Sequence, residues 1–129
     1  MLASRAVNMH YETDPDRRYL SGFSGGARVS SIAVETMPNF FNGAIFIGGA
    51  FNWHGDPQNM EAILNAGSYV FITGRKDQAR PEVLSTYRQY KNIETAHVTL
   101  IDDQRLGHEL PKAKMFRQAL GFLSSEEKD

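Results

Sequence analysis

The sequence feature that most constrains the fold is an unbroken apolar run, GAIFIGGAF, at residues 43–51. A strand with one face in solvent alternates apolar and polar residues, so a run without that alternation is typical of a strand covered on both faces of a parallel sheet. Three further segments, at 17–23, 68–73 and 96–101, have strand-like sequences. Because crossovers between parallel strands are right-handed, we expect the four strands side by side in chain order. The chain therefore predicts an α/β fold: a parallel four-stranded sheet with helices on both faces.

Helix-like segments alternate with these strands, and proline or glycine marks most of their ends. Proline lacks a donor N–H and glycine loses more backbone entropy than other residues, so both interrupt helices. We expect helices over 2–11, over 25–37, from Asp56-Pro57 to Gly67, from Pro81 and from Pro111. No linker or internal repeat interrupts this order. The sequence thus predicts one domain at 1–123, followed by a polar tail, SSEEKD, at 124–129.

Composition excludes several classes of protein. The net charge of −1, with no long run of one sign, argues against a nucleic-acid surface. No cysteine is present, which removes disulfides and thiolate metal sites. No apolar stretch approaches the roughly 18 residues of a transmembrane helix, and no histidine or carboxylate pair has metal-ligand spacing. The glycines match no nucleotide-binding pattern, so we expect neither a cofactor nor a metal. The cellular compartment stays undetermined.

The motif with the clearest chemistry is Gly22-Phe23-Ser24-Gly25-Gly26, a G-x-S-x-G sequence between an expected strand and an expected helix. A serine on such a sharp turn needs small neighbours, and its hydroxyl then stands above the carboxyl edge of the sheet. The N–H of Gly25 would point at an oxyanion developing on a substrate attacked by Ser24, and the helix dipole would help. A glycine-rich turn with a capping serine is the alternative, and the flanking strand and helix favour the nucleophile.

A serine hydroxyl needs a base to become a nucleophile, and in folds with this turn the chain order is serine, acid, histidine. Four histidines are present. His10 precedes the serine, His97 lies in an expected strand, and His54 follows one. His108 lies in the loop LGHELP between the last strand and the last helix, which suits a general base.

The acid that orients this histidine is predicted to be Asp77. It follows the third strand, at the same sheet edge as Ser24, since parallel strands end at one edge and ligands of open α/β sheets bind there. Asp102 and Asp103 follow the fourth strand and are the competing candidates. The loops after the first, third and fourth strands thus predict a site formed by Ser24, Asp77 and His108.

These residues resemble a known group of enzymes. The stretch DPDRRYLSGFSGGAR is similar to the nucleophile region of α/β-hydrolase esterases, notably the polyhydroxybutyrate-depolymerase-like and feruloyl-esterase-like branch. The segments GRKDQARPEV and GHELP are similar to the acid and histidine regions of the same group. The resemblance covers nearly the whole chain and implies the C-terminal half of an α/β-hydrolase fold. It also implies an ester hydrolase acting through an acyl-enzyme, with Ser24 as nucleophile, His108 as general base and acid, Asp77 as orienting acid and Gly25 as oxyanion donor.

The chain departs from this group because its serine turn follows the first strand rather than the fifth of eight. We therefore expect a truncated domain: a fragment of a longer enzyme, a minimal hydrolase or one half of an assembly. Strand 17–23 becomes a sheet edge, and bare edges invite pairing with another chain. This predicts a homo-oligomer or an association through the 17–23 edge. The alternative function is a weakly active or inactive half-hydrolase that serves as an interaction module.

Two aromatic residues complete the predicted site. Phe51 and Trp53 follow the second strand at the same edge. We expect them to form a wall for the acyl or aromatic group of a small ester substrate. Ordinary packing of this loop against the helices is an equal alternative.

Overall fold

The structure, a computed structural model, describes residues 18–36, 40–51, 67–93 and 97–125. The elements run in the order β1 (Tyr19–Phe23), α2 (Gly25–Thr36), β2 (Gly43–Ile47), β3 (Ser68–Lys76), α4 (Arg80–Lys91), β4 (His97–Gly107) and α5 (Ala113–Ser125). The helix expected at 2–11 lies outside the described residues, and so does the helix expected at 56–67 as far as residue 66.

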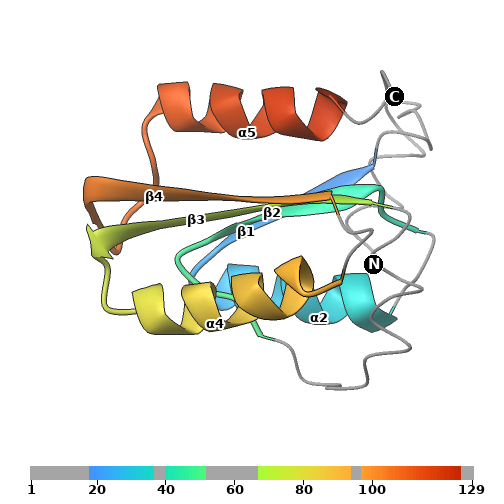
Figure 1. Ribbon diagram of the computed structural model, residues 1–129, viewed down its shortest axis with the longest axis horizontal. Coiled ribbons are helices and arrows are strands. Elements are labelled where there is room, and N and C mark those ends of the chain that lie inside the picture. The colour runs from blue at the N-terminus through green and yellow to red at the C-terminus, as the bar shows by residue number, and fades with distance from the viewer. Residues whose placement is uncertain (1–17, 37–39, 52–66, 94–96, 126–129) are drawn as a thin grey trace.

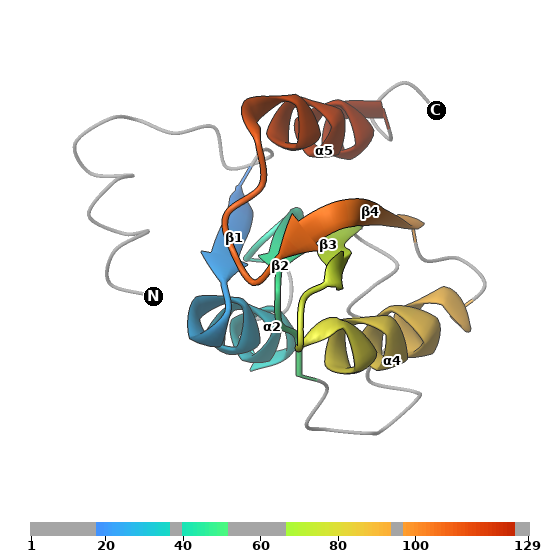
Figure 2. The same cartoon turned by 90° about the vertical axis from the view of Figure 1, so that its left-hand side faces the viewer.

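The four strands form one parallel sheet in the order β1-β2-β3-β4, as chain order predicts. Phe23 at the end of β1 lies opposite Ile47, Ile47 lies opposite Ile72, and Ile72 lies opposite Ile101. Helix α5 covers one face of the sheet, and α2 and α4 cover the other (Figures 1 and 2). The predicted fold class, a parallel four-stranded sheet with helices on both faces, is confirmed.

The core lies on both faces of the two central strands, because successive residues of a strand point to opposite sides. Phe46 and Phe71 belong to the cluster under α2 and α4, whereas Ile47 and Ile72 belong to the cluster under α5. All four side chains are at most 2% exposed. Fully burying a side chain of this size stabilises the fold by about 1.5–3 kcal/mol. The apolar run that predicts a doubly covered strand therefore forms the centre of the sheet.

The expected boundary of the second strand is wrong. β2 ends at Ile47 rather than at 51, because Gly48 has φ +64° and leaves the extended conformation. Glycine adopts this left-handed region without the steric cost that other residues have. The residues from Gly48 onward therefore form a loop at the carboxyl edge of the sheet.

The third and fourth strands are longer than expected, since β3 continues to Lys76 and β4 to Gly107. Their ladder passes beyond the end of β2, with Thr73 opposite Asp102 and Gly74 opposite Asp103. Both aspartates thus lie within β4 rather than after it. The polar composition of this extension conceals it from an analysis of apolar periodicity.

Helix α5 also extends beyond its expected end, since it continues to Ser125 and takes in the first residues of the predicted polar tail. Among the helices that the structure describes, none combines the length and apolar character needed to cross a bilayer.

Candidate active site

Ser24 lies on the turn between β1 and α2 and has φ +57°, which is uncommon for a residue other than glycine. Its N–H donates to the carbonyl of Ile47 at 2.8 Å, and its own carbonyl accepts from the N–H groups of Ala27 and Arg28 at 3.0 and 3.2 Å. A conformation of this kind costs of order 1–3 kcal/mol and persists only where the surroundings impose it. Here the end of β2 and the first turn of α2 hold it from two sides.

The glycines around Ser24 have different roles. A Cβ at Gly22 would lie 2.3 Å from the carbonyl oxygen of Gly26 and 2.7 Å from Ser30 Oγ, so the turn closes only with glycine there. A Cβ at Gly25 or Gly26 would meet nothing within 4 Å. The expected need for small residues therefore holds at Gly22 but not at the two glycines after the serine. Both of these are exposed, which leaves the start of α2 open beside Ser24.

A chain of hydrogen bonds joins Ser24, His108 and Asp77. Ser24 Oγ lies 2.8 Å from His108 Nε2, and His108 Nδ1 lies 2.8 Å from Asp77 Oδ1. An ionised carboxylate only accepts, so Nδ1 carries the proton and Nε2 of the neutral ring accepts from the serine hydroxyl. The structure thus brings together the three residues predicted from the loops after β1, β3 and β4.

Asp77 is buried, with 1% of its side chain exposed, whereas the His108 side chain is 29% exposed. A buried carboxylate is costly unless it is hydrogen-bonded. Besides His108, Asp77 Oδ1 accepts from the Ala79 N–H at 2.8 Å, and the Asp77 N–H donates to the carbonyl of Gly74 at 3.0 Å. These contacts fix the carboxylate on the inner side of the imidazole.

Gly48 and Gly49 lie directly against this chain of hydrogen bonds. A Cβ at Gly48 would stand 3.2 Å from Asp77 Oδ2 and 3.4 Å from His108 Nδ1, and one at Gly49 would stand 2.6 Å from the carbonyl oxygen of Ser24. A side chain at Gly49 would therefore collide with the backbone of Ser24, and one at Gly48 would require Asp77 or His108 to shift by a few tenths of an ångström. The apolar run at 43–51 predicts both glycines inside a strand. Their adjacent positions are the sequence signal that could have indicated the end of the strand and the loop beside the site.

Glu82, in the first turn of α4, connects the elements around Ser24. Its Oε2 accepts from Arg28 Nε at 2.9 Å and from the Ala50 N–H at 2.9 Å. The hydrogen bond and charge of Glu82 raise the pKa of Arg28 above its usual value. The carboxylate thus joins α2, α4 and the loop after β2. No local sequence pattern relates these positions, so the sequence carries no signal for this contact.

The carboxylates that compete with Asp77 are both engaged elsewhere in the described part of the chain. Asp102 pairs with Arg80, with Oδ2 2.6 Å from Nη2, and this hydrogen bond lowers the pKa of Asp102. Asp103 Oδ1 accepts from the N–H groups of Arg105 and Leu106 at 2.7 and 3.0 Å. Of the three aspartates considered, the structure brings Asp77 to His108.

The two predicted aromatic residues are placed unequally. The Phe51 side chain is 47% exposed, and its N–H donates to Ser31 Oγ at 2.8 Å, which ties it to the middle of α2. Trp53 lies outside the described residues. Phe23 is an aromatic neighbour that the sequence did not single out: its ring centroid lies 5.0 Å from that of His108. A substrate-binding role for Phe51 stays a prediction.

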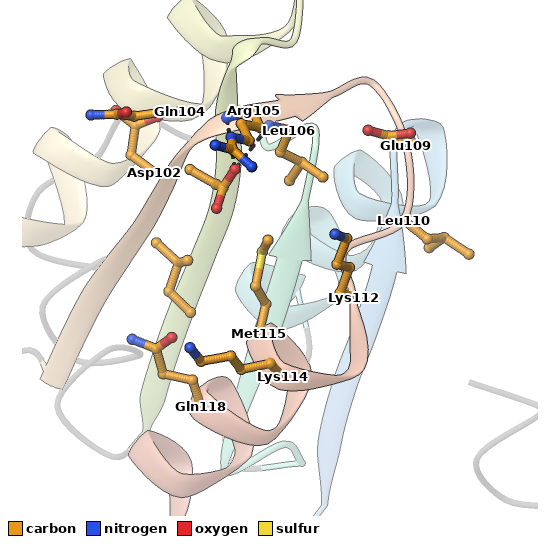
Figure 3. Close-up of a pocket in the computed structure, with 12 residues that line it drawn as sticks. Asp102, Gln104, Arg105, Leu106, Glu109, Leu110, Lys112, Lys114, Met115 and Gln118 are labelled. Carbon is orange, nitrogen blue, oxygen red and sulfur yellow. Dashed lines mark hydrogen bonds between the residues drawn. The ribbon is translucent and has the colours of Figure 1, made fainter.

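A cavity of about 850 Å³ lies beside the site, between the end of β4 and the start of α5 (Figure 3). Leu106, Leu110 and Met115 give it apolar surface, and Lys112 and Lys114 stand on the α5 side. Its lining does not include the three hydrogen-bonded residues of the site, so it is a neighbouring space rather than the space over the Ser24 hydroxyl.

Within the described ranges, no group of three His, Cys, Asp or Glu side chains is arranged to hold a metal ion.

Comparisons with known proteins agree with this fold. The sequence profile of the prolyl oligopeptidase family matches residues 1–104, a range that contains Ser24 and Asp77 and ends before His108. No curated protein sequence matches the chain significantly.

Solved structures with a similar fold include three hydrolases. A ferulic acid esterase matches with a TM-score of 0.73 at 12% identity, and the match covers 95% of this chain and 58% of that one. A carboxylesterase of Bacillus cereus matches with a TM-score of 0.68 at 18% identity, over 92% of this chain and 54% of that one. The S-formylglutathione hydrolase of Staphylococcus aureus matches with a TM-score of 0.63 at 12% identity, over 95% of this chain and 55% of that one. The chain thus spans about half the length of each of these structures. At such identities the likeness concerns the fold, and the predicted resemblance to α/β-hydrolase esterases is confirmed at that level.

Proposed function

The chain belongs to the prolyl oligopeptidase family of serine hydrolases, and from this premise we propose that it hydrolyses carboxylic esters through an acyl-enzyme. The observation that carries the proposal is the chain of hydrogen bonds from Ser24 through His108 to Asp77, with both contacts at 2.8 Å. Nucleophile, base and orienting acid within hydrogen-bond reach of one another are what serine hydrolysis requires.

Acylation begins at the Ser24 hydroxyl. Its Oγ attacks the ester carbonyl carbon while His108 Nε2 takes the hydroxyl proton, which gives a tetrahedral intermediate and an imidazolium ion. The Gly25 N–H, at the exposed start of α2, donates to the oxyanion, and the positive end of the helix dipole adds to its stabilisation. Collapse of the intermediate breaks the C–O bond, and the imidazolium returns its proton to the departing alcohol.

Deacylation repeats these steps with water. His108 Nε2 takes a proton from water as the water oxygen attacks the acyl carbon, and the carboxylic acid then leaves as Ser24 Oγ recovers a proton. Asp77 stays ionised throughout and holds the Nδ1–H. The buried position of its carboxylate keeps the imidazole in one orientation while the ring alternates between its neutral and charged forms.

A peptide or amide is the second candidate substrate, and the family match favours it because the family takes its name from an oligopeptidase. The acyl-enzyme chemistry is the same for both bonds. An amine leaves less readily than an alcohol, so amide cleavage depends more on proton donation by His108. Ester and amide substrates with the same acyl group would discriminate the two activities.

We also propose that the β1 edge associates with a second copy of the chain. In the described sheet β1 pairs with β2 alone, and its residues are half-buried or exposed, whereas every residue of β2 is buried. Exposed strand edges are templates for pairing. Ser21→Lys would add a charge to this edge, and sedimentation should then show a dimer becoming a monomer; a monomer already present in the unaltered chain would contradict the association.

The proposed activity is tested with p-nitrophenyl butyrate and a fluorophosphonate probe. The unaltered chain should hydrolyse the ester and become labelled, and Ser24→Ala and His108→Ala should lower hydrolysis on the order of 10³-fold or more. Ser124→Ala, an exposed serine on α5, is the matched control and should leave both readouts unchanged. Equal turnover by the unaltered chain and Ser24→Ala would sink the proposal, and the half-hydrolase that acts as an interaction module would then take its place.

A further inference from the structure

We infer that Asp103 is a positioning residue that sets His108 by shaping a bulge at the end of β4. The inference rests on the proposed function, because positioning matters for catalysis only if His108 is the base. It concerns a carboxylate that competes with Asp77 in the sequence and has a different task in the structure. The argument depends on the pairing of β3 with β4 and on three close contacts made by the bulge.

The bulge is visible in the strand register. β3 and β4 pair regularly from Ser68 opposite His97 as far as Gly74 opposite Asp103, and the next pair is Lys76 opposite Gly107. Regular pairing would place Arg105 opposite Lys76, so the bulge takes up two extra residues of β4. Two residues of a regular strand span about 7 Å, at about 3.3 Å each. Without the bulge, the residues after β4 would therefore lie about 7 Å farther along the direction of the strand.

This difference decides whether His108 reaches Asp77. Asp77 follows directly after β3, and His108 follows directly after β4. The observed contact between their side chains is 2.8 Å. A displacement of about 7 Å exceeds any hydrogen-bond distance, so the bulge is what keeps the two strand ends level.

Asp103 is the last residue of β4 in regular register before the bulge, and its side chain stabilises the bulge. Its Oδ1 accepts from the N–H groups of Arg105 and Leu106, at 2.7 and 3.0 Å. Aspartate favours turns because its side chain accepts hydrogen bonds from backbone N–H groups a few residues ahead. Here the two N–H groups belong to residues that have no register partner in β3. The bulge forms one wall of the cavity in Figure 3, where Gln104, Arg105 and Leu106 follow one another.

Gly74 and Leu106 fix the bulge against β3. A Cβ at Gly74 would lie 2.2 Å from the carbonyl oxygen of Leu106, so the bulge packs on the bare backbone of the glycine. The Leu106 side chain, 6% exposed, anchors the bulge in the core under α5. The carbonyl of Gly74 also accepts from the Asp77 N–H. Gly74 thus contacts both the segment that carries Asp77 and the bulge that precedes His108.

The test compares Asp103→Ala, which removes the acceptor, with Asp103→Asn, which retains an oxygen at Oδ1. The readouts are kcat and KM for p-nitrophenyl butyrate, and the low-field proton resonance of the His108 Nδ1–H, assigned by its loss in His108→Ala. Asp103→Ala should lower kcat on the order of 10²-fold with KM little changed, because a misplaced base affects the transition state rather than binding. It should also weaken the resonance, and Asp103→Asn should restore both.

Two controls separate positioning from general damage. Gln104→Ala, an exposed residue of the same bulge, should leave kcat and the resonance unchanged. In a His108→Ala background, Asp103→Ala should cause no further loss of activity, since its effect passes through the imidazole. A further loss there would overturn the inference, as would full retention of rate and resonance in Asp103→Ala. If the unaltered chain shows no activity that depends on Ser24, the proposed function fails, and the resonance still tests whether Asp103 places His108.

Discussion

Gly48 and Asp77 follow neighbouring strands, and a Cβ at Gly48 would stand 3.2 Å from Asp77 Oδ2. The glycine therefore lies directly beside the buried carboxylate. Its φ of +64° is a second reason for glycine, because an L-residue in this region is strained. Geometry and strain thus combine at one position beside the proposed catalytic residues.

Gly48→Ala should lower both stability and activity. The left-handed conformation would cost about 1–2 kcal/mol of unfolding free energy. The added methyl group would also displace Asp77 or His108 by a few tenths of an ångström. Because a misplacement of about 1 Å costs on the order of 10²-fold in rate, this smaller shift should lower kcat by roughly 3- to 10-fold. Urea unfolding and kcat for p-nitrophenyl butyrate measure the two effects.

Gly121→Ala is the matched control for this substitution. Gly121 lies in α5, where a Cβ would meet nothing within 4 Å. Alanine in a helix interior should raise the unfolding free energy by roughly 0.5–1 kcal/mol and leave kcat unchanged. If Gly48→Ala lowered stability but retained full kcat, the loop after β2 would have no part in placing the site.

Asp77→Asn should lower kcat by roughly 10⁴-fold with a small change in KM. Asparagine loses the carboxylate charge that stabilises the imidazolium ion, and an amide that turns Nδ2 toward His108 would also hold the ring in the tautomer that cannot receive the serine proton. Asp102→Asn provides the comparison, because Asp102 pairs with Arg80 rather than with His108. Steady-state kinetics of the two variants would contradict the assignment if both lost activity equally.

The fold and the three proposed catalytic residues were predictable because both depend on rules that act along the chain. Unbroken apolar runs indicate doubly covered strands. Parallel strands then end at one edge, which brings Ser24, Asp77 and His108 together without knowledge of any contact between them. That these residues are catalytic stays a prediction.

Other features depend on contacts that no local pattern encodes. The extension of β3 and β4 is polar, so its strands lack the apolar period that revealed the rest of the sheet. The role of Asp103 depends on a bulge, which appears only when two strands are paired. Glu82 meets Arg28 across 54 positions of sequence. Side chains that brace a site from a distance in sequence require the folded geometry to be recognised.

The pair formed by Arg80 and Asp102 predicts a pH dependence of stability. In the folded chain, the Arg80 hydrogen bond lowers the pKa of Asp102 below its ordinary value of 3.8. A group with a lowered folded pKa stabilises the fold above its unfolded pKa, and this contribution is lost as pH falls through the folded pKa. The stabilisation is therefore complete at neutral pH and declines below about pH 4.

Urea unfolding of the unaltered chain and Asp102→Asn measures this contribution. The difference in unfolding free energy between them should be largest near neutral pH and should shrink as pH falls toward about 2. Glu109→Gln, an exposed change on the loop after β4, is the control. A difference that stayed constant over this pH range would show that ionisation of Asp102 does not contribute.

The contacts of Glu82 predict an order among its variants. Glu82→Gln keeps an oxygen for the Ala50 N–H and loses the charge that attracts Arg28. Because the two side chains are 44% and 36% exposed, solvent screens this pair, and the loss should be about 0.5 kcal/mol. Glu82→Ala also leaves the Ala50 donor without its acceptor, which adds about 1–2 kcal/mol.

A double-mutant cycle separates the two contacts of Glu82. Arg28→Ala combined with Glu82→Gln should give an interaction energy of about 0.5 kcal/mol that declines with added salt, since the Debye length falls from about 8 Å at physiological ionic strength to about 3 Å at about 1 M salt, close to the 2.9 Å separation of this pair. The Ala50 contact should be independent of salt.

Because Ala50 follows Gly49, which lies against the carbonyl of Ser24, Glu82→Ala should also slow fluorophosphonate labelling of Ser24, whereas Glu82→Gln should not. Equal labelling rates in the two variants would confine Glu82 to stability.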